Sequence, residues 1–108
     1  MSFERRGSQR RPAGFFLNAV EDGIPMLCIA RDISDTGARI EPLFDRRASR
    51  PRQLRMEFHV PGMRKVIVTQ ADCVRHEEAS RTIGVCFTSL SAPDRAMLRR
   101  HLASVSLT

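Results

Sequence analysis

The sequence contains no tryptophan and no tyrosine, so its six aromatic residues are all phenylalanine. It holds eighteen lysines and arginines, of which Lys65 is the single lysine and seventeen are arginine. No apolar run is long enough to span a membrane. The apolar stretch from Gly14 to Val20 is also too short for the core of a signal peptide. We therefore expect no membrane association and a cytoplasmic location.

Cysteine and histidine are scarce and scattered. Cys28, Cys73 and Cys86 are odd in number, widely spaced and set in apolar segments, so buried reduced thiols of a cytosolic protein are the default interpretation. The three histidines fall on different elements without metal-ligand spacing, and no serine has a recognisable nucleophile context. We expect no catalytic residue, no bound metal and no cofactor.

A length of 108 residues favours one compact domain. The net charge of +6 and the pI near 10.9 favour an anionic partner. Arginine forms planar two-pronged contacts with phosphate and guanine and stacks on flat rings, so the excess of arginine over lysine suits a nucleotide. A high-GC coding bias explains most of these arginines equally well.

Hydrophobic periodicity predicts an all-β domain that ends in a helix. The residues alone allow a small antiparallel barrel or a sandwich, with a hairpin turn at Glu21-Asp22-Gly23. Ser91 and Pro93 mark the start of a helix over about 91–105, whose apolar stripe packs against the strands. The predicted strands cover residues 15–20, 24–30 with an extension toward Ser34, 37–41, 54–60, 65–76 and 82–87.

Strand alternation also predicts which apolar side chains face inward. Within the segment 65–76, the inward residues are Val66 and Val68, with Cys73 and Val74 as further candidates. Four phenylalanines fall in patterns typical of a core: Phe15, Phe16, Phe58 and Phe87.

The first twelve residues have no hydrophobic period and carry four arginines. We expect residues 1–12 to form a flexible basic arm and residues 13–108 to form the folded domain.

The stretch Arg31-Asp32-Ile33-Ser34-Asp35-Thr36-Gly37 follows the most apolar run of the chain. If the strand continues through Ser34, its period of two turns Asp32 and Ser34 outward and Ile33 inward. Gly37 is the residue type that allows a positive φ in a tight reversal. The stretch thus gathers a carboxylate, a hydroxyl and an open glycine backbone, although any strand reversal favours these residue types.

Two short patterns occur in sequence. Arg6-Gly7-Ser8-Gln9-Arg10 has the form R-x-x-x-R, and the segment from Asp32 to Gly37 has the form D-x-S-x-x-G. In this order, in a small all-β chain, they resemble the two motifs of the PilZ family, the bacterial receptor domain for cyclic di-GMP. The segment Ile83–Phe87 followed by the capped helix is similar to the closing strand and C-terminal helix of that family. The resemblance covers nearly the whole chain.

The resemblance implies a six-stranded antiparallel β-barrel with a C-terminal helix that binds cyclic di-GMP and catalyses nothing. By position, Arg6 and Arg10 would grip the phosphates and guanines, while Asp32, Ser34 and Gly37 would line the barrel side of the site. The chemistry of the residues agrees, because a guanidinium donates twice to guanine O6 and N7 or to a phosphate. A carboxylate accepts from the N–H groups on the Watson–Crick edge of guanine.

Arg5 and Arg11 flank the first motif and are peripheral candidates, as ligand contacts or as plain solvated charges. One or two ligand molecules per chain are both compatible with this cluster. We expect the arm to become ordered on the ligand and to change the surface that an unidentified downstream protein partner contacts.

Two other functions are open. One is a PilZ-like adaptor that binds protein and no nucleotide. The other is a basic barrel that binds single-stranded nucleic acid, which needs exposed stacking aromatics. Since the phenylalanines are predicted to be core residues, we do not expect a nucleic acid polymer as partner.

Overall fold

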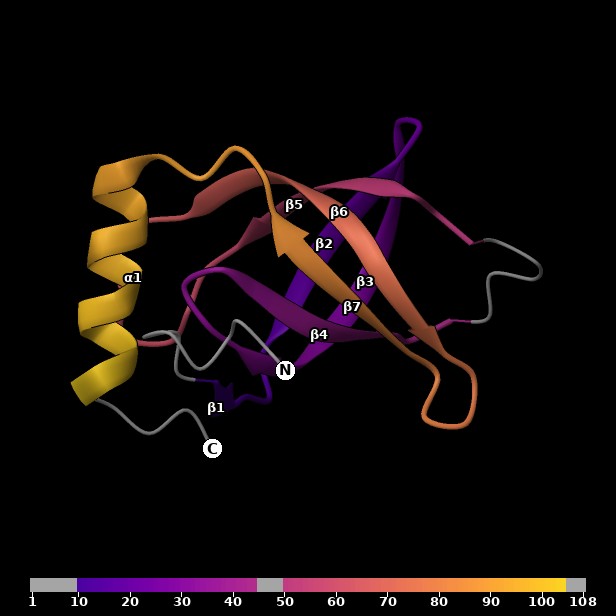
Figure 1. Cartoon of the computed structure of the whole chain (residues 1–108), viewed down its shortest axis with the longest axis horizontal. Coiled ribbons are helices and arrows are strands. Elements are labelled where there is room, and N and C mark those ends of the chain that lie inside the picture. The colour runs from indigo at the N-terminus through magenta and orange to yellow at the C-terminus, as the bar shows by residue number, and fades with distance from the viewer. Residues whose placement is uncertain (1–9, 45–49, 105–108) are drawn as a thin grey trace.

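The computed structural model describes residues 10–44 and 50–104, which form seven β-strands and one C-terminal helix (Figure 1). The six predicted strands and the helix are all present, and a short additional strand precedes them. The elements are β1 (Arg11–Pro12), β2 (Phe16–Glu21), β3 (Ile24–Ile33), β4 (Gly37–Pro42), β5 (Gln53–Phe58), β6 (Ile67–Glu77), β7 (Thr82–Phe87) and α1 (Ala92–Ser104).

The strands form a closed antiparallel barrel, as predicted from the family resemblance. The strand order is β1-β3-β2-β5-β6-β7-β4, and a further pairing between β3 and β4 closes the sheet on itself. The ten-residue β3 pairs with β2, β4 and β1 along its length, so it is central to the barrel wall. The short β1 lies outside the closed barrel as an extra strand on β3. It falls within the segment that the sequence assigned to a flexible arm.

The β2–β3 hairpin turns at Asp22 and Gly23, as the sequence predicted. Both residues have a positive φ, 51° at Asp22 and 78° at Gly23. A two-residue hairpin needs positive φ at both central positions when its twist matches that of the strands, and Asp-Gly adopts this conformation readily.

The core fills the barrel from alternate positions of the strands. Phe58 lies between Phe15 and Phe87, with ring centroids 6.3 Å and 5.7 Å apart, respectively. Leu98 and Leu102 of α1 are buried in the same cluster, so the helix covers one end of the barrel (Figure 1). Among the described residues, no helix is long and apolar enough to cross a membrane.

Two predictions of side-chain direction are wrong. In β6 the buried residues are Ile67, Thr69 and Ala71, whereas Val66, Val68 and Val74 are exposed. The run Val66-Ile67-Val68 is apolar on both faces of the strand, so its composition alone did not select the inward face.

Phe16 was predicted to be a core residue, but its side chain is 62% exposed. Its neighbour Phe15 occupies the inward position, and adjacent strand residues point to opposite faces. The remaining predicted core phenylalanines are buried.

Candidate functional site

The two sequence motifs meet at one carboxylate. Asp32 Oδ1 accepts a hydrogen bond from Arg10 Nη1 at 2.5 Å, and its Oδ2 accepts one from Arg39 Nε at 3.0 Å. Arg10 belongs to the R-x-x-x-R pattern and Asp32 to the D-x-S-x-x-G pattern, 22 residues apart. The carboxylate is only partly exposed, and it binds both guanidiniums at the barrel surface.

The extra strand β1 is what brings Arg10 to this place. Arg11 pairs with Ile33 and Pro12 pairs with Asp32, and Ala13 N donates to Arg31 O at 2.9 Å. Because Arg10 immediately precedes β1, its side chain reaches the carboxylate beside it. Arg11 is half-buried. The other candidate arginines, Arg5 and Arg6, lie outside the described residues.

The end of β3 is irregular where Asp32 lies. The pairing between β3 and β4 shifts register between Ala30 and Asp32, which is a β-bulge or a similar irregularity. Bulges change the direction of side chains and occur often near functional sites. Beyond the shift, Asp32 pairs directly with Arg39, so these two residues face each other across the hairpin.

Arg39 is a partner of Asp32 that the sequence analysis missed. The signal was present, because β4 begins at Gly37 and Asp32 lies the same distance before the reversal as Arg39 lies after it. Pairing the two strands across the turn would have placed the guanidinium on the carboxylate.

Ser34 does not face outward, contrary to the prediction. Its side chain is 1% exposed, and its Oγ accepts hydrogen bonds from Thr36 N at 3.1 Å and Gly37 N at 3.2 Å. The strand β3 ends at Ile33, so the period of two no longer applies to the next residue. The hydroxyl satisfies the backbone donors of the reversal and thereby fixes its shape.

Gly37 is required for a reason other than the predicted positive φ. Among the described glycines, positive φ occurs at Gly23 and Gly62, and Gly37 is not one of them. A Cβ at Gly37 would lie 2.2 Å from the carbonyl oxygen of Val85, which is closer than real Cβ contacts. Gly37 pairs with Cys86 on β7, so the glycine lets β4 approach β7 and close the barrel next to the site.

Asp35 fastens this turn to the helix. Its carboxylate is 2% exposed and accepts from Arg99 Nη2 at 2.8 Å and Arg99 Nε at 2.9 Å. Arg95 Nη1 donates to the backbone oxygen of Asp35 at 3.4 Å. No local pattern could have predicted this pairing, because the two partners are 64 residues apart in the sequence. The same turn thus carries Asp32 at its entry and holds α1 at its centre.

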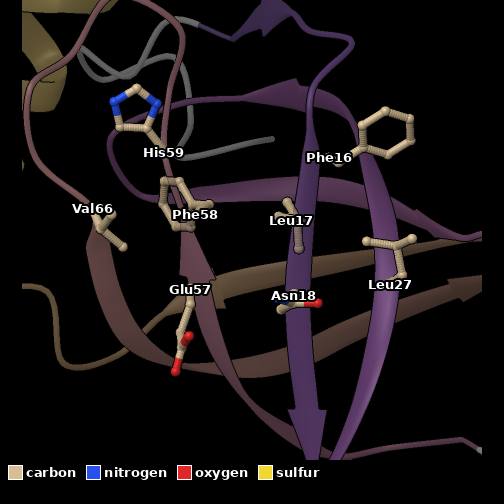
Figure 2. A pocket seen from close by; sticks show the side chains of 8 residues that line it. All are labelled: Phe16, Leu17, Asn18, Leu27, Glu57, Phe58, His59 and Val66. Carbon is tan, nitrogen blue, oxygen red and sulfur yellow. The ribbon is translucent and has the colours of Figure 1, made fainter.

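A shallow groove of about 270 Å³ lies elsewhere on the barrel (Figure 2). It contains none of the predicted site residues. Exposed Phe16 and Leu27 lie on one side of it, and Glu57, His59 and Val66 lie on the other. The remaining lining residues are Leu17, Asn18 and Phe58. Within residues 10–44 and 50–104, no group of three or more histidine, cysteine, aspartate or glutamate side chains could hold a metal ion.

Comparison with known proteins assigns the family. The family model described as PilZ domain matches residues 4–104, and the chain belongs to this family. PilZ domains are receptor or adaptor domains, and cyclic di-GMP is the ligand of the family. The prediction from the two motifs is therefore confirmed at the level of the family.

Solved structures agree with the fold. The PilZ domain of YcgR from Escherichia coli, solved with c-di-GMP, has 16% sequence identity and a TM-score of 0.68, covering 93% of this chain and 90% of that one. The Bacillus subtilis inhibitor of motility, MotI/DgrA, has 16% identity and a TM-score of 0.74, covering 89% of this chain. Since the match covers 48% of that protein, this chain spans about half of its length. A comparison with curated protein sequences finds no match.

Proposed function

We propose that this chain is a cyclic di-GMP receptor that works through a protein partner and has no catalytic activity of its own. The observation that carries the proposal is the junction of Arg10 with Asp32, which joins the two motifs of the family at the barrel surface. A guanidinium next to a carboxylate can recognise a guanine nucleotide, because the guanidinium can bind the phosphate and the carboxylate can bind the Watson–Crick edge of the base.

The chemistry of the junction suits guanine. An ionised carboxylate has about four lone-pair sites, and the two arginines on Asp32 take one each. The remaining sites can accept from N1–H and N2–H on the Watson–Crick edge of guanine. Adenine presents no such pair of donors at these positions, so the site should favour cyclic di-GMP over cyclic di-AMP.

The other proposed site residues have different roles. Arg6 and Arg10 would donate to phosphate oxygens and to guanine O6 and N7. Ser34 and Gly37 are internal to the turn, so we assign them the task of holding its backbone in the conformation that the ligand meets. Arg5 and Arg11 stay peripheral candidates.

We propose that ligand binding orders the segment before Arg10. Fixing eight residues costs on the order of 8–16 kcal/mol, while each hydrogen bond to a charged group returns about 1.5–3 kcal/mol. Several such bonds and stacking of arginine on the bases are therefore needed to balance the cost. Amide hydrogen exchange in residues 2–9 should slow on saturation with ligand, and equal exchange with and without ligand would exclude this mechanism.

The output is proposed to be contact with a separate protein, whose surface meets the ordered arm. The exposed groove at Phe16 favours protein contact as part of that output, because exposed apolar surface tends to mark interaction sites. Exposure of Phe16 and Phe44 also removes one argument against single-stranded nucleic acid, whereas the phenylalanines of the barrel core are buried. The proposed location of the receptor is the cytoplasm.

A calorimetric titration tests the proposal. Wild-type protein should bind cyclic di-GMP at micromolar concentration or tighter and give no heat with cyclic di-AMP. Arg10→Ala and Asp32→Ala should each weaken binding by about tenfold or more, because each removes hydrogen bonds to a charged group. If the wild-type protein gives no heat at high ligand concentration, the chain is a protein-binding adaptor without nucleotide.

A further inference from the structure

We propose that Arg39 is a third ligand-binding arginine, which Asp32 orients toward a phosphate of the cyclic dinucleotide. The inference rests on the proposed function and adds to that site a residue outside both family motifs as they occur in this sequence. Three observations support it: the single Nε contact of Arg39 with Asp32, the charges of Arg10, Asp32 and Arg39, and the small contribution of such an ion pair to folding stability.

Arg39 binds Asp32 through Nε alone. The bond is 3.0 Å long. Within residues 10–44 and 50–104, no residue accepts a hydrogen bond from the two Nη groups of Arg39. A guanidinium has five N–H donors in a fixed plane, so the Nε contact sets the orientation of the plane and leaves four donors at its outer end. The side chain is 42% exposed, which lets an anion reach these donors.

Asp32 divides its negative charge between two arginines. Its Oδ1 binds Arg10 and its Oδ2 binds Arg39, so the carboxylate does not neutralise Arg39 alone. Among the described residues, no other carboxylate pairs with Arg39, since the nearby Glu41 pairs with Arg31 at 2.7 Å. A phosphate would bring negative charge to the outer donors of Arg39, and both guanidiniums bind the same carboxylate, so one ligand could contact both.

Structural stability gives little reason for the second arginine. Ion pairs between exposed side chains contribute little to folding. The neighbouring pair of Arg31 and Glu41 has the same cross-strand character and lies on the same two strands, and the Arg31 side chain is 44% exposed. It therefore offers a matched control, an arginine whose carboxylate partner is not part of the ligand site.

The test is calorimetric titration of cyclic di-GMP into wild-type protein and the variants Arg39→Ala, Arg39→Lys and Arg31→Ala. Arg39→Ala should bind about tenfold or more weakly, and Arg31→Ala should stay within about twofold of the wild type. Arg39→Lys keeps the charge without the planar fork, so it should recover part of the affinity. The difference between wild type and Arg39→Ala should shrink at high salt, because salt screens an exposed contact with phosphate.

The outcomes separate this inference from the proposed function. If the wild type binds and Arg39→Ala binds equally well or more tightly, Arg39 only neutralises Asp32 and the inference is wrong, while the receptor function stands. If the wild type does not bind, both are wrong. Thermal melts of all variants confirm that each is folded, and Arg39→Gln replaces Arg39→Ala should the alanine variant melt early.

Discussion

Replacing Gly37 by alanine should destabilise the barrel much more than the same change at other glycines. The new Cβ would lie 2.2 Å from Val85 O, which is a backbone atom and cannot rotate away. Restoring ordinary contact requires β4 and β7 to separate by about 1 Å. The adjacent hydrogen bond from Phe87 N to Thr36 O, now 2.8 Å, would then be stretched beyond useful length.

The magnitude follows from these two effects. Overpacking in a closed structure costs about 1–3 kcal/mol, and a buried backbone group left without its hydrogen bond adds about 1–3 kcal/mol. Some relaxation of the strands will reduce the sum, so we expect a loss of about 2–4 kcal/mol in the free energy of unfolding. In a domain of this size, that lowers the melting temperature by roughly 10 °C or more.

Two glycines provide controls for the assay, which is urea unfolding combined with a thermal melt. A Cβ at Gly84 meets its nearest atom, Arg75 Cβ, at an ordinary 3.5 Å, and a Cβ at Gly14 has nothing within 4 Å. Alanine at either position should change stability by less than about 1 kcal/mol. If Gly37→Ala melts with the controls and has lost only ligand binding, the glycine is kept for the ligand and our explanation of it is wrong.

Three further changes test the surroundings of the site. Arg99→Ala should cost about 1–3 kcal/mol in urea unfolding, because the buried Asp35 carboxylate loses both donors, whereas the exposed Arg100→Ala should be nearly neutral. Ser34→Ala leaves two backbone N–H groups of the turn without their acceptor, so their hydrogen exchange should become faster while the fold is kept. Burial, aided by two neighbouring carboxylates, raises the pKa of Cys73 to about 11, so its alkylation at pH 8 should be about 100-fold slower than in the urea-unfolded chain. Equal stability of the Arg99 and Arg100 variants would contradict the role given to the contact between Arg99 and Asp35. Unchanged hydrogen exchange in Ser34→Ala would contradict the role of the Ser34 hydroxyl, and equal alkylation rates would contradict the burial of the Cys73 thiol.

Local chemistry explains which parts of the fold could be predicted. The hairpin at Asp22 and Gly23 depends on two adjacent residues, and the helix start at Ser91 depends on a hydroxyl that accepts from Asp94 N at 3.1 Å. Each signal lies within a few residues of the structure that it specifies. The two strand faces around Val66 carry similar hydrophobicity, so the sequence pattern had no basis for choosing between them.

The sequence predicted the motif residues of the site but not the contacts that bring them together. Arg10 and Asp32 were both identified from the motifs. The short strand β1, which places Arg10 beside Asp32, was not predicted, because a strand of two residues has no detectable hydrophobic periodicity. The contact between the turn and the helix joins Asp35 to Arg99, 64 residues apart in the sequence, so only the folded structure reveals it. Ser34 and Gly37 were predicted to line the ligand site. Ser34 instead bonds within the turn because β3 ends before it, and Gly37 lies against the backbone of β7.

The most direct test of the central claim is a two-dimensional amide NMR titration of the isotope-labelled chain with cyclic di-GMP. We predict saturable shifts concentrated at residues 10–12 and 32–39, where the two motifs meet, with little change along the groove at Phe16 and Val66. An absence of shifts at millimolar ligand would contradict the account, and so would shifts confined to the groove.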